Sequence, residues 1–258
     1  RRRTLIFMAI HIRSKSEIDA LRKAGKVAAE AIELAKSLIK PGVSTKFISE
    51  ETEKFIVSKG ARASFKGLYN FPEAICISVN EVIIHGIPNN TVLKDGDIVG
   101  LDIGTEIDGW YGDTAVTVPV SKISEDDTRL LACAEESLEF AISSIKEGMR
   151  FKELSKLIED FIEAKGYKPL KNFCGHGIGR SPHEEPSILN YVEGNPSQGP
   201  KIKNGMVFCI EPMICQKSGN SKVLEDKWSV VSVDGLRGSH FEHTVAVING
   251  RAEVLSKI

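Results

Sequence analysis

The sequence predicts an α+β fold in which one helix–helix–strands unit occurs twice and both copies share a curved antiparallel sheet. The main observation is an internal repeat: residues 40–60 align without gaps on residues 146–166, with nine identical pairs among 21 positions. The glycines near both ends of this segment are kept, Gly42 with Gly148 and Gly60 with Gly166. Chance similarity between two amphipathic helices does not explain shared glycines at both ends. The period is much longer than the roughly 20–50 residues of a solenoid repeat, so we interpret the chain as a duplicated fold.

The second observation is that each half begins with two helical segments. Residues 17–39 and 125–145 carry apolar residues at three- and four-residue spacing, which is typical of an amphipathic helix. Each is followed by one copy of the repeated segment, which also reads as a helix. We therefore expect two helices at the start of each unit.

The third observation is that extended, turn-punctuated sequence follows the helices in each half. Such runs are typical of strands. They cover residues 74–79, 82–85 and 98–118 in the first half, and 206–215, 228–233 and 241–248 in the second. The two units, at about 12–120 and 121–258, pair most simply through one continuous sheet. Helices would cover one face and leave the other free for a site.

The bulk composition is that of one globular domain. An apolar fraction of 41% in 258 residues supports a substantial core, and we expect residues 8–258 to form a single catalytic domain. We interpret residues 1–7 as a leader or a cloning-derived addition, with Met8 as the true start; a functional basic tail is the alternative.

Charge and cysteine content exclude several classes of protein. The formal net charge of −1 argues against nucleic-acid binding as the main function. The five cysteines are scattered without a C-x-x-C pair, which argues against a disulfide framework or a thiolate zinc site and indicates a reducing, cytoplasmic location. No apolar run approaches the roughly 20 residues needed to span a membrane.

Four carboxylates and one histidine carry the chemistry that the sequence predicts. They are Asp102, Asp113, Glu211, Glu242 and His176. Most of them sit among apolar strand-forming residues, where an uncompensated carboxylate is costly to bury. Four converging negative charges would also raise each other's pKa values unless cations intervened. Two divalent ions would balance the four charges, so the pattern predicts a two-metal hydrolase.

The two aspartates can be placed by strand geometry. Asp108-Gly109 is a two-residue hairpin turn, and its register sets Asp113 opposite Gly104. Asp102 and Asp113 then lie on one face as diagonal neighbours, within about 7–8 Å. Both can reach ions spaced about 3.5–4 Å apart, and we expect Gly104 to leave room for an ion. An exposed hairpin carboxylate is the alternative for either residue alone, but two on one face of an apolar hairpin favour a metal site.

The remaining ligands stand in other settings. Glycines flank His176 on both sides, which frees the backbone for close approach. Glu211 ends a run that reads as a buried strand, and Pro212 indicates the strand end. Glu242 precedes the strand-like residues 243–248. The alternatives are a plain turn histidine and structural ion pairs, although no Arg or Lys lies close by in sequence.

Five motifs in order resemble one known family. They are Asn-Glu-Val-Ile-Ile-His-Gly-Ile-Pro at 80–88, the Asp102/Asp113 hairpin, Cys-Gly-His-Gly-Ile-Gly-Arg-Ser-Pro-His-Glu-Glu-Pro at 174–186, Ile-Glu-Pro-Met at 210–213 and Phe-Glu-His-Thr at 241–244. Together they resemble the type I methionine aminopeptidases, from about Met8 to Leu255. The resemblance implies the pita-bread fold, a pseudo-twofold duplication with metal ions between its halves.

The resemblance also implies roles for the metal ligands. Asp102 would chelate one ion, His176 and Glu211 the other, and Asp113 and Glu242 would bridge both. Mn²⁺, Fe²⁺, Co²⁺ or Zn²⁺ would suit these oxygen and imidazole donors. A water or hydroxide bridging the two ions would be the nucleophile, and Glu211 would accept its proton.

The resemblance implies that two further histidines flank the scissile amide. His183 would hydrogen-bond the substrate carbonyl or the tetrahedral intermediate. His85 would position the amide nitrogen or protonate the leaving amine. His243 lies beside Glu242 on the opposite strand face, and we expect it to be structural.

His85, His183 and five apolar residues would bind the substrate, and the apolar residues would contact its methionine side chain. They are Phe65, Leu68, Phe71, Cys76 and Trp228. Leu68 stands where the family usually has Tyr, Phe65 where a small residue or Cys is common, and Pro182 where an aromatic residue is common. We expect these changes to alter the width of the pocket and to leave the chemistry intact, since a flexible thioether still suits an apolar pocket.

The resemblance implies removal of the initiator methionine from nascent polypeptides, with a preference for small second residues. A ribosome contact would be transient, and a monomer is expected. One alternative is an X-Pro aminopeptidase or prolidase, although those relatives carry an extra N-terminal domain for which we see no room before residue 17. The other is a non-catalytic binding module, although such relatives lose metal ligands.

Overall fold

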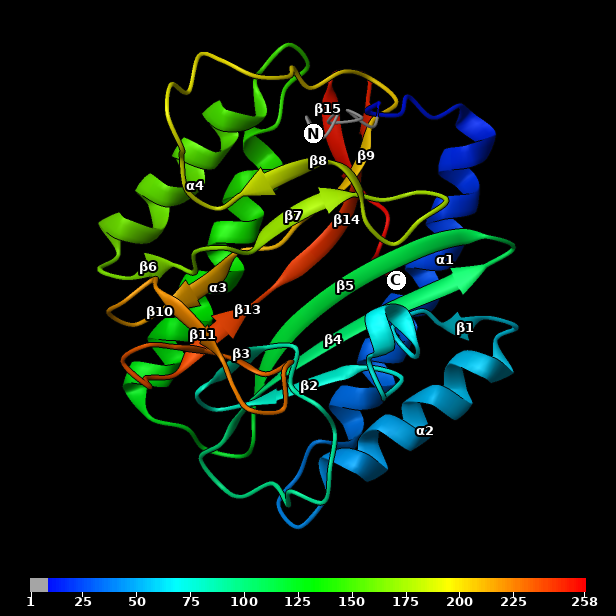
Figure 1. Ribbon diagram of the computed structural model, residues 1–258. Helices are drawn as coiled ribbons and strands as arrows, with labels where there is room; N and C mark the ends of the chain where they lie inside the picture. The colour runs from blue at the N-terminus through cyan, green and yellow to red at the C-terminus, as the bar shows by residue number, and fades with distance from the viewer. Residues whose placement is uncertain (1–8) are drawn as a thin grey trace, which may run out of the picture.

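The computed structural model describes residues 9–258, so the expected leader at 1–7 and the expected start at Met8 lie outside the described residues. The predicted helices are present as α1 (Lys15–Leu38), α2 (Thr45–Ser58), α3 (Glu125–Ser144) and α4 (Phe151–Ala164), and a short 3₁₀ turn forms η1 (Leu68–Asn70) (Figure 1). Within residues 9–258, no helix is both long enough and apolar enough to cross a membrane.

Strands follow the helices in both halves, as predicted, but seven of the fifteen strands within residues 9–258 lie outside the runs that the sequence predicts. In the first half they are β1 (Arg62–Ala63), β2 (Cys76–Val79), β3 (Val82–Ile84), β4 (Ile98–Ile107) and β5 (Trp110–Pro119). In the second half they are β6 (Lys168–Pro169), β7 (Cys174–Gly177), β8 (Glu184–Leu189), β9 (Val207–Ile210), β10 (Met213–Cys215), β11 (Ser221–Val223), β12 (Val230–Ser232), β13 (Gly238–His240), β14 (Glu242–Ile248) and β15 (Arg251–Val254).

One curved sheet joins the two halves (Figure 1). It has nine strands in the order β1-β4-β5-β14-β9-β7-β8, with β2 added to β4 and β15 added to β14. Its pairings are antiparallel. Strands β13-β10-β6 and β11-β12-β3 form two smaller three-stranded sheets. The halves therefore meet where β5 pairs with β14.

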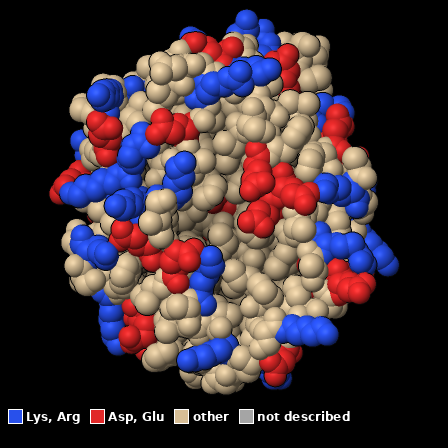
Figure 2. All heavy atoms as spheres, turned by 180° about the vertical axis from the view of Figure 1, so that it is seen from behind, with Lys and Arg blue, Asp and Glu red and all other residues tan. Residues whose placement is uncertain are grey.

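Helices cover one face of this sheet, as expected from the sequence (Figure 1). Each half has its own core: Ile48 of α2 and Leu101 of β4 belong to the first, and Leu130 of α3 and Phe208 of β9 to the second. All four side chains are fully buried, and burial of one such side chain is worth about 1.5–3 kcal/mol. On the face opposite to the view of Figure 1, basic and acidic side chains are interspersed (Figure 2).

The structure confirms the internal repeat at the level of the backbone. Gly42 and Gly148 both have a φ of +88°, and Gly60 and Gly166 have φ values of +73° and +86°. A glycine adopts such left-handed conformations without steric cost, which explains why the repeat keeps these residues. The first helix of each half also begins alike, because the hydroxyl of Ser14 accepts from the Glu17 amide and that of Ser124 from the Asp127 amide.

The predicted hairpin is also confirmed. Ile107 lies opposite Trp110 and Gly104 opposite Asp113 in the β4–β5 ladder. Asp108 and Gly109 have φ values of +53° and +75°, the positive values that a two-residue turn of this kind requires. Local turn chemistry therefore fixes the register that aligns the two aspartates.

Candidate metal centre and active site

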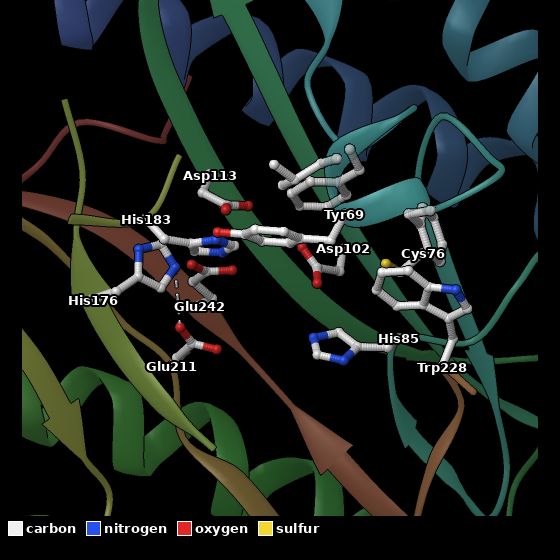
Figure 3. Close-up of a pocket in the computed structure, with 13 residues that line it drawn as sticks. Tyr69, Cys76, His85, Asp102, Asp113, His176, His183, Glu211, Trp228 and Glu242 are labelled. Atoms are coloured by element: carbon white, nitrogen blue, oxygen red, sulfur yellow. Dashed lines mark ion pairs between the residues drawn. The ribbon is translucent and has the colours of Figure 1, made fainter. Parts of the chain in front are cut away.

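One cavity of about 190 Å³ is lined by all twelve side chains that the sequence predicts for the site (Figure 3). The first half contributes Phe65, Leu68, Phe71, Cys76, His85, Asp102 and Asp113, and the second contributes His176, His183, Glu211, Trp228 and Glu242. Tyr69 is the thirteenth lining residue. The site therefore lies at the junction of the two halves.

Four carboxylates point toward one another in this cavity (Figure 3). Asp102 lies on β4, Asp113 on β5 and Glu242 at the start of β14, while Glu211 directly follows β9. Asp113 is 4% exposed and Glu242 is 2% exposed. The break between β9 and β10 at Glu211 agrees with the strand end that Pro212 predicts.

Two threonines hold the strands that carry the carboxylates. The Asp113 amide donates to Thr244 Oγ1 at 3.1 Å, and the same hydroxyl donates to the Asp113 carbonyl at 2.8 Å. Thr114 Oγ1 donates to the Glu242 carbonyl at 2.8 Å. These side chains extend the β5–β14 pairing across the junction, so the position of Asp113 relative to Glu242 is fixed by buried hydrogen bonds.

The four buried carboxylates of the cavity would be stabilised by cations. Burial raises the pKa of Asp113 to about 7, and burial together with the neighbouring carboxylates raises the pKa values of Asp102, Glu211 and Glu242. Among residues 9–258, Asp102 Oδ1, Asp113 Oδ1 and Glu242 Oε1 are buried without a hydrogen-bond partner. An unpaired buried acceptor costs about 1–3 kcal/mol. Divalent ions would satisfy these oxygens and neutralise their charge.

The donor atoms are close enough to share an ion. Ligand atoms of Asp113, His176, Cys209 and Glu242 lie within 4.8 Å of one another. Oxygen and imidazole donors of this kind suit Mn²⁺, Fe²⁺, Co²⁺ or Zn²⁺. The residues present therefore fit a divalent metal centre.

Glycines bring His176 to this centre, as the sequence predicts. A Cβ on Gly175 would lie 2.3 Å from the Cys209 carbonyl oxygen, and one on Gly177 would lie 2.1 Å from that of Glu185. His176 Nδ1 is 3.0 Å from the Gly177 carbonyl, which can only accept, so Nδ1 carries the proton. Burial lowers the pKa of His176 to about 3, so the ring is neutral and the Nε2 lone pair is free for an ion.

Two more histidines face the cavity. His85 follows β3 with a φ of +58°, and burial lowers its pKa to about 4. Burial also lowers the pKa of His183. The His183 ring lies parallel to that of Tyr69, with centroids 5.9 Å apart, and edge-on to His176 at 4.4 Å. Both rings are therefore neutral near pH 7 and can donate one N–H each.

The apolar wall is a small cluster of its own. Phe65, Phe71 and Cys76 are buried in it, with Leu68 and Trp228 packed against them. Phe71 meets Trp228 edge to face, with ring centroids 5.1 Å apart. This wall faces the carboxylates across the cavity, so an apolar side chain bound there would place its backbone at the polar centre.

The prediction that Gly104 leaves room for an ion is wrong. A Cβ at this position would lie 2.2 Å from Ser64 Oγ and 2.5 Å from the Phe65 ring. The missing side chain therefore makes room for Phe65, which lines the apolar wall. His243, in contrast, agrees with its structural expectation, because its Nδ1 lies 2.9 Å from Ser256 Oγ and it does not line the cavity.

Sequence reasoning missed three residues at the site: Tyr69, His240 and Cys209, whose buried thiol belongs to the donor cluster of Asp113, His176 and Glu242. Tyr69 lines the cavity although it is 67% exposed. It lies in η1, between the predicted pocket residues Leu68 and Phe71. His240 is 3% exposed and lies within 3.5 Å of Glu211. It precedes Glu242 by two residues, so the alternation of side chains along a strand could have placed both on one face.

Comparison with known proteins identifies the class to which this fold and site belong. Residues 19–249 match metallopeptidase family M24. The crystal structure of methionine aminopeptidase from Thermotoga maritima superposes with a TM-score of 0.94 and 38% sequence identity, covering 97% of this chain and 100% of that one. Prolidase from Pyrococcus furiosus matches with a TM-score of 0.78 at 25% identity, covering 96% of this chain and 65% of that one. The predicted α+β pita-bread fold is confirmed.

Sequence relatives narrow the assignment. Methionine aminopeptidase of Helicobacter pylori is 57% identical over 252 residues, which cover 97% of this chain and 100% of that protein. Methionine aminopeptidase 1 of Bacillus subtilis is 43% identical over 94% of this chain and 97% of that protein. The chain therefore belongs to metallopeptidase family M24 and, within it, to the methionine aminopeptidases.

Proposed function

We propose that this chain is a metal-dependent aminopeptidase that removes the N-terminal methionine from peptides and nascent polypeptides. The observation that carries the proposal is one cavity in which four buried carboxylates and His176 face an apolar wall. Such a cavity can hold an apolar side chain and the adjoining peptide bond at the same time. The family membership and the names of the relatives support this function.

Five residues would hold two divalent ions. Asp102 would bind one ion, His176 and Glu211 the other, and Asp113 and Glu242 would bridge both. The unpaired buried oxygens of Asp102, Asp113 and Glu242 support this assignment. When bound, the ions supply Lewis acidity, which lowers the pKa of water and polarises a carbonyl.

The side chains around the centre would move and hold the protons. Glu211 would accept a proton from the attacking water, because its carboxylate lies in the cavity beside His176. His183 would donate a hydrogen bond to the carbonyl oxygen of the scissile bond, where negative charge develops. His85 would stabilise or protonate the leaving amine. Both histidines are neutral at pH 7, so each has one N–H for this purpose.

The apolar wall would bind the methionine side chain. Phe65, Leu68, Phe71, Cys76 and Trp228 line it, and a flexible thioether adapts to such irregular apolar surfaces. We propose that residues 8–258 act as one catalytic domain in the cytoplasm, as a monomer with at most a transient ribosome contact. Small second residues would be preferred, since the side chain after methionine must fit beside the metal centre.

A proline-specific peptidase is the rival function on this fold. The similarity to the Pyrococcus furiosus prolidase favours considering it. The higher identity to methionine aminopeptidases, 57% against 25%, argues for the methionine-specific activity.

The test is the release of free methionine from Met-Ala-Ser by metal-stripped protein, before and after Mn²⁺ or Co²⁺ is restored. Ala-Pro and Ala-Pro-Ser serve as counter-substrates. We expect metal-dependent release of methionine and negligible cleavage before proline. Cleavage of the proline peptides alone would favour the prolidase-like function, and no cleavage by folded, metal-loaded protein would favour a binding module.

A further inference from the structure

A buried histidine outside the predicted set lies against Glu211. His240 ends β13, is 3% exposed, and its Nε2 has no hydrogen-bond partner among the described residues. The side-chain oxygen of Glu211 next to it, Oε2, lies 3.5 Å from this nitrogen. An unpaired ring nitrogen in a dry environment is unfavourable, so a partner for it is expected.

Hydrogen bonds on both sides hold the backbone of His240 in place. The His240 amide donates to Thr117 Oγ1 at 2.9 Å, and the same hydroxyl donates to the His240 carbonyl at 2.9 Å. On its other side His240 pairs with Met213 in the β13–β10 ladder. The backbone of His240 is thus fixed to both neighbouring strands, which sets the point from which its buried ring approaches Glu211.

Glu211 lies between two imidazoles. Its Oε1 is 3.4 Å from His176 Nε2, and its Oε2 is 3.5 Å from His240 Nε2 (Figure 3 shows the His176 side). Its backbone carbonyl accepts from Asn190 Nδ2 at 2.9 Å. The two carboxylate oxygens therefore have different surroundings: one faces a metal ligand, and the other faces a ring that ligates nothing.

We propose that His240 is a positioning residue whose Nε2–H donates a hydrogen bond to Glu211 Oε2 and so turns Oε1 toward the metal that it shares with His176. A carboxylate only accepts, so the shared proton belongs to the ring nitrogen. A small rotation of the Glu211 side chain brings 3.5 Å to hydrogen-bond length. This inference rests on the proposed function of Glu211 as ligand and proton acceptor.

A hydrogen bond from His240 to the metal ligand Glu211 would have two consequences for the site. It fixes the orientation of a ligating carboxylate, and contacts of this kind are typically worth about 10- to 100-fold in metal affinity or activity. It also leaves one carboxylate oxygen anchored while the other serves the metal. His243, on the far side of Glu242, cannot do the same, because its ring nitrogen bonds Ser256 instead.

The test compares two variants of nearly equal shape. His240→Gln keeps an N–H donor, whereas His240→Met has the same length without one, and His240→Phe is the second donor-free variant if His240→Met does not fold. Ser239→Ala is the matched control, because Ser239 is buried on the same strand but points to the other face. Mn²⁺ affinity of metal-stripped protein is measured by equilibrium dialysis, and kcat and KM by methionine release.

We expect the donor-free variants to bind one Mn²⁺ about 10- to 100-fold more weakly and to lose a similar factor in kcat, with KM little changed. His240→Gln should recover both to within a few-fold of the natural protein, and Ser239→Ala should match it. Donor-free variants with full Mn²⁺ affinity and kcat would overturn the inference, and so would equal losses in His240→Gln and His240→Met. If the natural protein releases no methionine while the Mn²⁺ affinities still separate as expected, the proposed function fails and the positioning role stands.

Discussion

The two halves share a scaffold but contribute different chemistry. Each half begins with two helices, and the segments that contain α2 and α4 match in sequence and carry left-handed glycines at the same positions. The first half then adds most of the apolar wall, His85 and the two hairpin aspartates, whereas the second adds Trp228, His176, His183 and both glutamates. The repeated segments build the frame, and the unrepeated segments after the second helix of each half carry the site. Duplication thus supplied a cleft whose two sides could diverge.

The junction between the halves brings ligands from both halves to one centre. Asp113 and Glu242 come from different halves, yet Thr114 and Thr244 fix their strands to one another through buried hydrogen bonds. A metal centre bridging the halves would therefore depend equally on both.

The largest effect is expected from substituting one bridging ligand in each half. Asp113→Asn and Glu242→Gln each remove a negative charge that a divalent ion requires. We expect each to lower methionine release by more than about 100-fold, beyond the usual cost of losing an outer contact. Steady-state kinetics at saturating Mn²⁺ measure this. Near-full activity in one variant would show that only one half holds the functional centre.

Metal removal is expected to destabilise the junction most strongly above pH 6.5. The pKa of Asp113 is about 7 in the folded state against 3.8 for the free group, so between these values the folded state binds more protons than the unfolded state. Stability therefore falls as pH rises through this range, and the loss is complete just above pH 7. The histidines with lowered pKa values act only below their unfolded value near 6.5. The melting temperature of metal-stripped protein should drop by at least about 2–4 °C between pH 6.5 and 8. A flat profile, or one that Mn²⁺ does not raise, would contradict the account.

Shortening a side chain of the apolar wall should weaken peptide cleavage without changing metal affinity. Leu68→Ala removes apolar surface from the first-half wall and touches no proposed metal ligand. We expect kcat/KM for Met-Ala-Ser to fall at least about 10-fold while Mn²⁺ affinity is unchanged. Equilibrium dialysis and kinetics on one preparation test both. A parallel loss of metal affinity would show that wall and centre are not separable.

A smaller effect is expected at Tyr69, which crosses from the first half to stack on His183 of the second. Tyr69→Ala removes that stack and should lower kcat/KM by about 2- to 10-fold, whereas Tyr69→Phe should retain it. Tyr69 is largely exposed, so neither variant should change the melting temperature. Equal losses in both variants would assign the role to the hydroxyl instead.

The smallest effect tests the symmetry of the frame. A Cβ added at Gly60 or Gly166 would meet nothing within 4 Å, so only the positive φ opposes alanine. Each alanine variant should cost about 1 kcal/mol of unfolding free energy and leave activity unchanged. Denaturant unfolding curves measure this. A clear difference between the two sites would mean that the repeat is not equivalent in the two halves.

Local features of the sequence predicted much of this structure. The β4–β5 register followed from Asp108-Gly109 and strand alternation, and the helices followed from periodicity. Strand β7 was not predicted, because its sequence is Cys-Gly-His-Gly and glycine has a low strand propensity. The glycines are there because other backbone segments approach closely. The charge balance of four buried carboxylates predicted a two-metal site, and strand geometry paired Asp102 with Asp113. The role of each ligand came from the family resemblance, since partners so far apart in sequence meet only through tertiary pairing.

The errors and omissions have the same physical origin. Gly104 was assigned to an ion because the neighbour that fills its space, Phe65, belongs to another segment. His240 and Tyr69 were missed because their roles depend on contacts with Glu211 and His183 across the cavity. Side-chain packing between distant segments decides such details; alternation along one strand could have put His240 on the face of Glu242 but not beside Glu211.

The most direct test of the central claim is a crystal structure of the Mn²⁺-soaked protein, with an anomalous difference map recorded at the manganese edge. The account predicts two peaks about 3.5–4 Å apart in the cavity, with Asp113 and Glu242 contacting both. It also predicts ligands from both halves at the centre. Peaks elsewhere, or ions bound only by residues of one half, would contradict the account.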